Sequence, residues 1–277
     1  MLPTFLIIGA QKAATTSLWE YLRQHPGVYV PPALKEVNYF IEQGNWDKGI
    51  DWYERLYSDA EPSQRRGDVS PGYSMFPFYR GAPARAAELI PDARVVYMIR
   101  HPVERMVSAW VEGIGWGIED HDLVDAALYR ANYLLLSCYW LQLEEWLACF
   151  PREQVLVLRS EDLAADPGGT LDKILVHIGL EPAWRPSDLD VRHNLRGQKS
   201  IMPTRVRGMA GALRRLGWER SAVALGPRGR LKRLAKPVDE RSTLSPELYD
   251  ALGSCFRADL AKLRQLVGDE MDLWGLA

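Results

Sequence analysis

The segment at residues 5–22, FLIIGAQKAATTSLWEYL, constrains the fold of this chain more than any other. It opens with an uncharged run, residues 5–8, which is typical of a strand buried inside a parallel sheet. Gly9 interrupts the run, and from Thr15 onward the apolar residues recur at helical spacing. The segment therefore predicts a strand, a tight loop and a helix.

The predicted loop has the properties of a phosphate-binding site. A helix that follows a tight loop presents unpaired backbone N–H groups and the positive end of its dipole. Lys12 adds a full positive charge, and Thr15, Thr16 and Ser17 add hydroxyl donors. The order is not that of the ATP-binding P-loop, in which a hydroxyl follows the lysine and holds Mg²⁺, because Ala13 follows Lys12. A strand-to-helix turn that merely contains a lysine is the alternative interpretation.

Further along the chain, strands and helices alternate. Residues 94–99 predict a second buried strand, which ends at Arg100 and is followed by a helix from residue 103 to about 110. Residues 154–158 predict a third strand. This alternation predicts an α/β fold: a P-loop-like, three-layer domain with a central parallel sheet flanked by helices. Ligands bind such sheets at the carboxyl ends of the strands, where Lys12 and Arg100 are both expected.

We expect a single domain over residues 1–277, with the sheet core at 5–180 and a carboxyl-terminal helix at 245–274. The net charge of −2 gives no indication of nucleic-acid binding. No apolar stretch is long enough for stable membrane insertion. The three cysteines form no disulfide framework, and no leader peptide precedes the first strand, so we expect a cytoplasmic protein. Nothing indicates the oligomeric state.

Residues 192–241 form a strongly basic segment with 14 Lys or Arg residues against three acids. Three interpretations stay open for it. It is a solvated surface, a lid over a bound ligand, or a docking surface for an anionic partner such as an acidic carrier protein or a lipid head group.

Together these motifs resemble a known enzyme family. GAQKAATTSL after one strand, RHPVERMVSA after another, and a basic segment before a carboxyl-terminal helix are similar to the sulfotransferases that use 3′-phosphoadenosine 5′-phosphosulfate (PAPS). KEVNYF, at residues 35–40, looks most like the branch that includes the heparan sulfate sulfotransferases and their bacterial relatives. The resemblance covers almost the whole chain. It implies sulfuryl transfer without a metal, from PAPS to a hydroxyl, or less readily an amine, of a small or carrier-bound metabolite, with 3′,5′-adenosine bisphosphate (PAP) as the product.

The resemblance also implies roles for single residues. The backbone of the loop and the hydroxyls that follow it would hold the 5′-phosphate of the donor, and Lys12 would lie near the oxygen that bridges phosphate and sulfate. The residues concerned are Ala13, Ala14, Thr15, Thr16 and Ser17. Arg100 and Ser108 would grip the 3′-phosphate, and Arg196 and Lys199 would belong to a basic loop over the 3′-phosphate and the adenine.

Glu36 would be the general base that removes the proton of the acceptor, the alternative being a solvated charge beside Lys35. His101 and His193 are weaker candidates for assisting in that step. The chain departs from the heparan sulfate branch at Val69, where that branch typically carries a lysine. The departure leaves open whether a second cation serves the sulfate, and whether the acceptor resembles heparan.

Two other functions compete with this hypothesis. A P-loop kinase that acts on a small molecule would need a hydroxyl after its lysine to hold Mg²⁺, and Ala13 occupies that position. A non-catalytic nucleotide-binding module would need only the phosphate-binding loop. Aromatic residues that follow Glu36 or lie elsewhere in the chain would either line an acceptor pocket or belong to the core; these are Tyr39, Phe40, Trp46, Tyr73 and Trp116.

Overall fold

The computed structural model describes residues 1–116, 118–119, 121–187 and 244–277, with isolated residues between 189 and 237. The chain divides into two compact units. The first consists of Met1–Pro102, Cys138–Asn194 and Phe256–Ala277. The second consists of Val103–Ser137 and Leu195–Cys255.

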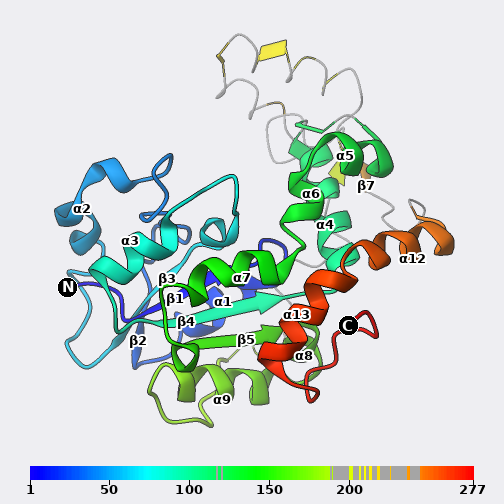
Figure 1. The fold of residues 1–277 in the computed structure, drawn as a ribbon. Helices are drawn as coiled ribbons and strands as arrows, with labels where there is room; N and C mark the ends of the chain where they lie inside the picture. Colours follow the sequence, from blue (N-terminus) through cyan, green and yellow to red (C-terminus); the bar gives the residue numbers. More distant parts are fainter. Residues whose placement is uncertain are drawn as a thin grey trace. The chain divides into compact units, whose positions relative to one another are not determined.

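The first unit is built on a five-stranded parallel sheet with the strand order β2-β3-β1-β4-β5 (Figure 1). The strands are β1 (Phe5–Gly9), β2 (Val28–Tyr29), β3 (Arg65–Val69), β4 (Arg94–Ile99) and β5 (Val155–Arg159). All residues of β1 are buried, as its uncharged sequence predicts for a strand covered on both faces. Ile7 pairs with Val69 on one side and with Val96 on the other, so β1 lies at the centre of the sheet.

Helices cover both faces of this sheet. The helices α3 (Ala82–Leu89), α7 (Tyr139–Leu147) and α13 (Arg257–Val267) lie in front of it in Figure 1, and α1 (Thr15–Leu22) lies behind it. The carboxylate of Asp259 on α13 accepts hydrogen bonds from the backbone N–H groups of Trp140 (2.9 Å) and Leu141 (3.0 Å), which satisfies the first turn of α7. The predicted three-layer α/β fold is confirmed.

The remaining elements of the first unit are short. They connect the strands or extend the helical layers of the sheet. Their bounds are η1 (Trp46–Lys48), α2 (Ile50–Arg55), η2 (Pro71–Ser74), η3 (Arg152–Gln154), α8 (Ser160–Ala165) and α9 (Pro167–His177).

The second unit is mostly helical where it is described. Its elements are α4 (Pro102–Trp116), whose first residue belongs to the first unit, α5 (Leu123–Tyr129), α6 (Asn132–Leu135), β6 (Ser200–Ile201), β7 (Lys236–Pro237) and α12 (Pro246–Cys255). The buried carboxylate of Glu119 accepts a hydrogen bond from the Tyr133 hydroxyl (3.1 Å) and pairs with Arg130 (3.0 Å). The guanidinium of buried Arg105 on α4 donates to the Ser137 hydroxyl (2.6 Å). Polar contacts therefore join α4 to the segment that contains α6.

The prediction of one helix over residues 245–274 is wrong in its extent. The segment forms two helices, α12 and α13, with a break at Phe256, and α13 ends before Gly268, whose φ is 76°. The apolar residues Leu252, Phe256 and Leu260 recur at helical spacing across the break, so the periodicity alone does not show it. Among the described residues, no helix combines the length and the apolar character that crossing a membrane requires.

Candidate active site

The loop between β1 and α1 has the backbone shape of an anion-binding nest. Lys12 (φ 74°) and Ala14 (φ 64°) both adopt the left-handed conformation, which is uncommon for residues other than glycine. A left-handed residue beside right-handed ones turns successive N–H groups toward one point. Ala14 precedes α1 and no side-chain cap hydrogen bond is made there, so a bound anion can take the place of a capping oxygen. The strand, loop and helix predicted at residues 5–22 are confirmed.

The residues predicted to bind the 5′-phosphate lie in this loop and in the first turn of α1. Ala13 is fully buried, and Thr15 and Ser17 are nearly so, whereas Lys12 and Thr16 are partly exposed. A rigid cradle costs less entropy on binding than a mobile loop, because its groups are already placed. The loop therefore meets the steric and electrostatic requirements of a phosphate site.

Arg100 lies against this loop. It directly follows β4, and its Nη1 donates a hydrogen bond to the carbonyl oxygen of Lys12 (3.2 Å). Its own carbonyl accepts a hydrogen bond from the Tyr139 hydroxyl (2.6 Å), which fixes the backbone from which the side chain projects. The structure thus brings Arg100 and the Lys12 loop together at the carboxyl ends of two neighbouring strands, as the rule for parallel sheets predicts.

His101 contributes no positive charge here at neutral pH. Burial, with the neighbouring positive charge of Arg100, lowers the pKa of His101 to about 4. Its backbone N–H donates to Glu161 (2.8 Å), and its ring packs edge-on against Trp274. These contacts describe a structural side chain, while His193, the other histidine considered, lies outside the described residues.

Glu36 is connected to the first turn of α1 through its neighbour Lys35. The ammonium of Lys35 lies 3.0 Å from Oε1 of Glu36 and donates to the hydroxyl of Thr16 on α1 at 2.8 Å. Half of the Glu36 side chain is exposed (50%), compared with 22% for Lys35. The structure therefore places the predicted base beside the first turn of α1. The sequence did not predict the contact of Lys35 with Thr16. It showed only that Lys35 is adjacent to Glu36.

A buried carboxylate at the end of β3 supports the segment that carries Glu36. Asp68 is inaccessible to solvent and accepts hydrogen bonds from the hydroxyls of Ser70 (2.5 Å), Tyr73 (2.6 Å) and Tyr53 (2.8 Å). Burial raises the pKa of Asp68, and the three hydroxyl donors oppose that rise by stabilising the ionised form.

Two of these hydroxyls also hold the backbone that follows Glu36. The N–H of Asn38 donates to Ser70 (2.9 Å), and the N–H of Tyr39 donates to the Tyr73 hydroxyl (2.9 Å). Asn38 has a positive φ of 51°, so hydrogen bonds are needed to keep this turn in place. The Asp68 network thus fixes the position of the Glu36 segment relative to the sheet.

This network gives a prediction for stability. An amide at position 68 has one acceptor oxygen and one donor group, so Asp68→Asn leaves at least one buried hydroxyl without its acceptor. We expect the free energy of unfolding to fall by about 2 kcal/mol, measured as a lower urea midpoint. Asp51→Asn, at an exposed acid on α2, is the matched control and should leave the midpoint unchanged. An unchanged midpoint for Asp68→Asn would show that the network does not stabilise this segment.

The aromatic residues singled out in the sequence mostly belong to the core. Tyr39, Phe40 and Tyr73 are buried, and the ring of Tyr39 stacks on that of Tyr53 with centroids 4.0 Å apart. The ring of Trp46 packs against Tyr39 at 5.2 Å. Packing accounts for these rings, so they give no indication of an acceptor pocket; the side chain of Trp116 lies outside the described part.

The other predicted site residues are less informative. Ser108 is buried on α4 in the second unit, and Arg196 and Lys199 lie outside the described residues. Val69 is buried in β3 beside Ile7, so this position supplies no cation. Over the described ranges of the chain, no group of three or more His, Cys, Asp or Glu side chains is arranged to hold a metal ion.

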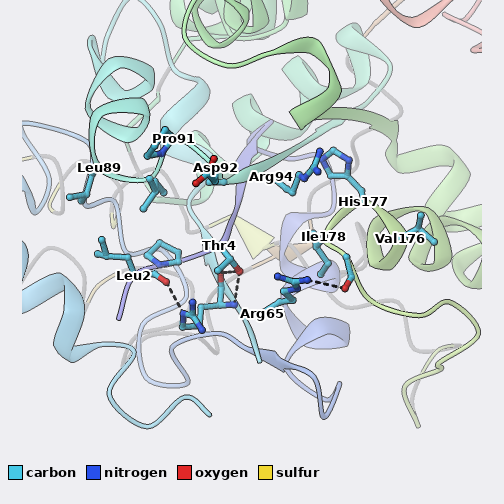
Figure 2. Close-up of a pocket in the computed structure, with 15 residues that line it drawn as sticks. Leu2, Thr4, Arg65, Leu89, Pro91, Asp92, Arg94, Val176, His177 and Ile178 are labelled. Atoms are coloured by element: carbon cyan, nitrogen blue, oxygen red, sulfur yellow. Dashed lines mark hydrogen bonds between the residues drawn. The ribbon is translucent and has the colours of Figure 1, made fainter. Parts of the chain in front are cut away.

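A cavity of about 540 Å³ lies at the opposite edge of the sheet (Figure 2). It is lined by Thr4, Arg65 and Arg94, which stand at the amino ends of β1, β3 and β4. Its basic groups bind backbone carbonyls: Arg65 donates to Gly179 (3.2 Å), beyond the end of α9, and Arg94 donates to the carbonyl of Glu153 (2.9 Å). Because these guanidiniums satisfy carbonyl groups, the cavity is better explained by the structure of the sheet edge than by a phosphate ligand.

Comparison with known proteins identifies the family of this chain. The family model described as a sulfotransferase domain matches residues 2–195. A heparan sulfate glucosamine 3-O-sulfotransferase 3B1 from Homo sapiens is 30% identical over 192 residues, which are 65% of this chain and 47% of that protein. A bifunctional heparan sulfate N-deacetylase/N-sulfotransferase 4 from Mus musculus is 29% identical over 213 residues, 68% of this chain and 23% of that protein.

This chain therefore spans less than half of the length of these curated relatives. The solved structure of a sulfotransferase from Alicyclobacillus acidocaldarius has the same fold, with a TM-score of 0.71 and 24% identity over 100% of this chain and 99% of that one. The family match covers the sheet, the loop between β1 and α1, Glu36 and Arg100. This chain belongs to the sulfotransferase domain family.

Proposed function

We propose that this protein transfers a sulfuryl group from PAPS to a hydroxyl, or less readily an amine, of a small or carrier-bound metabolite. One observation carries the proposal. The nest at residues 12–14, the guanidinium of Arg100 and the Lys35–Glu36 pair all meet at the first turn of α1 or the loop before it. Cations, backbone donors and a carboxylate at one strand end are what an anionic donor and a proton-accepting step require.

The proposed donor fits the described residues as follows. The N–H groups at the start of α1 and the hydroxyls of Thr15, Thr16 and Ser17 would hold the 5′-phosphate. Lys12 would face the oxygen that bridges phosphate and sulfate, and Arg100 would bind the 3′-phosphate through its planar fork of N–H donors. The roles of Ser108, Arg196 and Lys199 rest on the sequence resemblance.

The reaction would be an in-line displacement at sulfur. The acceptor oxygen forms a bond to sulfur while the bond from sulfur to the 5′-phosphate oxygen breaks, and PAP leaves with the electron pair of that bond. The proton of the acceptor passes to the Glu36 carboxylate. Negative charge grows on the leaving oxygen, so the ammonium of Lys12 stabilises the transition state more than the ground state.

The alternatives fit this site less well. A small-molecule kinase would need a hydroxyl after Lys12, and the methyl group of Ala13 is fully buried there. A non-catalytic nucleotide-binding module would need no carboxylate at the first turn of α1, where Lys35 holds Glu36.

Thermal unfolding with candidate nucleotides tests the proposal. PAP at 100 times its Kd should stabilise the protein by about 2.7 kcal/mol, a rise in Tm of several degrees. Arg100→Gln should lose most of this rise, whereas Arg94→Gln, a matched variant at the opposite edge of the sheet, should keep it. A rise with ATP and Mg²⁺ but none with PAP would contradict the proposed donor and favour the kinase.

The acceptor requires a separate experiment. The protein and PAPS are incubated with fractionated extracts, and products are detected by the mass gain of one sulfuryl group. Modified hydroxyl or amine metabolites are the expected result. Formation of PAP without any sulfated product would identify a hydrolase instead.

A further inference from the structure

Lys35 makes two short contacts that join different parts of the candidate site. Its ammonium lies 3.0 Å from the carboxylate of Glu36 and 2.8 Å from the hydroxyl of Thr16, which belongs to α1. Thr16 stands 19 residues before Lys35, so the contact depends on the folded path of the chain and not on sequence proximity. An ordinary surface ion pair has no such third partner and contributes little to stability.

The charges of the proposed site indicate a role for these contacts of Lys35. A PAPS molecule carries several negative charges, and an uncompensated carboxylate at the first turn of α1 would repel it. The base must nevertheless lie close to the sulfuryl group to accept a proton. Buried Val69, at the end of β3, supplies no cation that could compensate this charge.

We propose that Lys35 is a positioning residue, which holds Glu36 at the first turn of α1 and neutralises its charge so that the anionic donor and the base occupy the site together. The inference rests on the proposed function and adds a residue to it. Lys35 acts through Glu36. Its hydrogen bond to Thr16 determines where along α1 the Glu36 carboxylate lies.

Binding of PAP, measured by isothermal titration calorimetry, tests this role in four variants. Lys35→Met keeps the apolar stem and removes the ammonium, which leaves Glu36 uncompensated. We expect PAP affinity to fall about tenfold, slightly more than unit charges about 4 Å apart produce in bulk water. Glu36→Gln alone should bind PAP at least as tightly as the wild type. In Lys35→Met/Glu36→Gln the affinity should return to within about threefold of the wild type, because the repelling charge is gone.

Recovery in the double variant is the decisive result, since structural damage by Lys35→Met would not be repaired by a second substitution. Lys48→Met, at a lysine whose ammonium lies over the ring of Trp52, is the matched control and should bind PAP normally. Lys35→Gln replaces Lys35→Met if the latter does not fold. Wild-type affinity in Lys35→Met, or a double variant as weak as Lys35→Met, would overturn the role of Lys35. A wild-type protein that does not bind PAP would instead overturn the proposed function.

Discussion

Replacing Lys12 with Met should reduce turnover by about 10²- to 10³-fold, the loss seen when one preorganised donor to a developing negative charge is removed. In the proposed reaction, the charge on the bridging oxygen is larger in the transition state than in the bound donor. The Lys12 ammonium therefore contributes more to the rate of reaction than to donor binding. The Kd for PAP should rise much less than turnover falls. Turnover is measured with PAPS and an acceptor from the extract experiment, and the Kd by calorimetry.

Met is a suitable replacement for Lys12 because of the backbone conformation at this position. Lys12 has a φ of 74°, and Met and Lys carry the same backbone cost in that conformation, so the loop should keep its shape. Lys173→Met, at an exposed lysine on α9, is the control for loss of a surface charge. If turnover by Lys12→Met stayed near that of the wild type, the stabilising cation would have to be another residue.

Local sequence patterns were enough to predict the elements that build the candidate site. The helix predicted to begin at Thr15 begins there in the structure, and the strand at 94–99 is β4. A change of period and a glycine mark such boundaries directly. The approach of Arg100 to the Lys12 loop also followed, because parallel strands bring their carboxyl ends to one edge of the sheet.

The hydrogen bonds that hold the Glu36 segment in place could not be predicted in the same way. The hydroxyls that surround Asp68 come from two segments, and the one from Tyr53 is 15 residues away in the chain. Such hydrogen bonds depend on where the loops run, and no periodicity encodes that path. The break in the carboxyl-terminal helix was not predicted for a related reason. Phe256, which lies at the break and is buried, keeps the apolar spacing of the sequence.

The same limit explains why Lys35 was interpreted only as the neighbour of Glu36. In the sequence, adjacent opposite charges are most simply a solvated pair, and that interpretation predicts no third contact. The contact with Thr16 appears only when residues 35–36 are placed beside α1.

Glu36→Gln should lower turnover by about 10²-fold or more, the usual contribution of a positioned general base. The amide is similar in size to the carboxylate but cannot accept the proton of the acceptor. Donor binding should survive, because Glu36 contributes no positive charge and half of its side chain is exposed. Single-turnover measurements with PAPS separate the chemical step from product release, and calorimetry with PAP reports binding.

Glu42→Gln is the matched control for this prediction, because Glu42 is an exposed acid a few residues further along the same segment. It should keep wild-type turnover, while Glu36→Gln keeps PAP affinity and loses turnover. Loss of PAP affinity in Glu36→Gln would indicate that the carboxylate supports the fold of the loop rather than the reaction. Unchanged turnover in Glu36→Gln would show that the proton acceptor is another group.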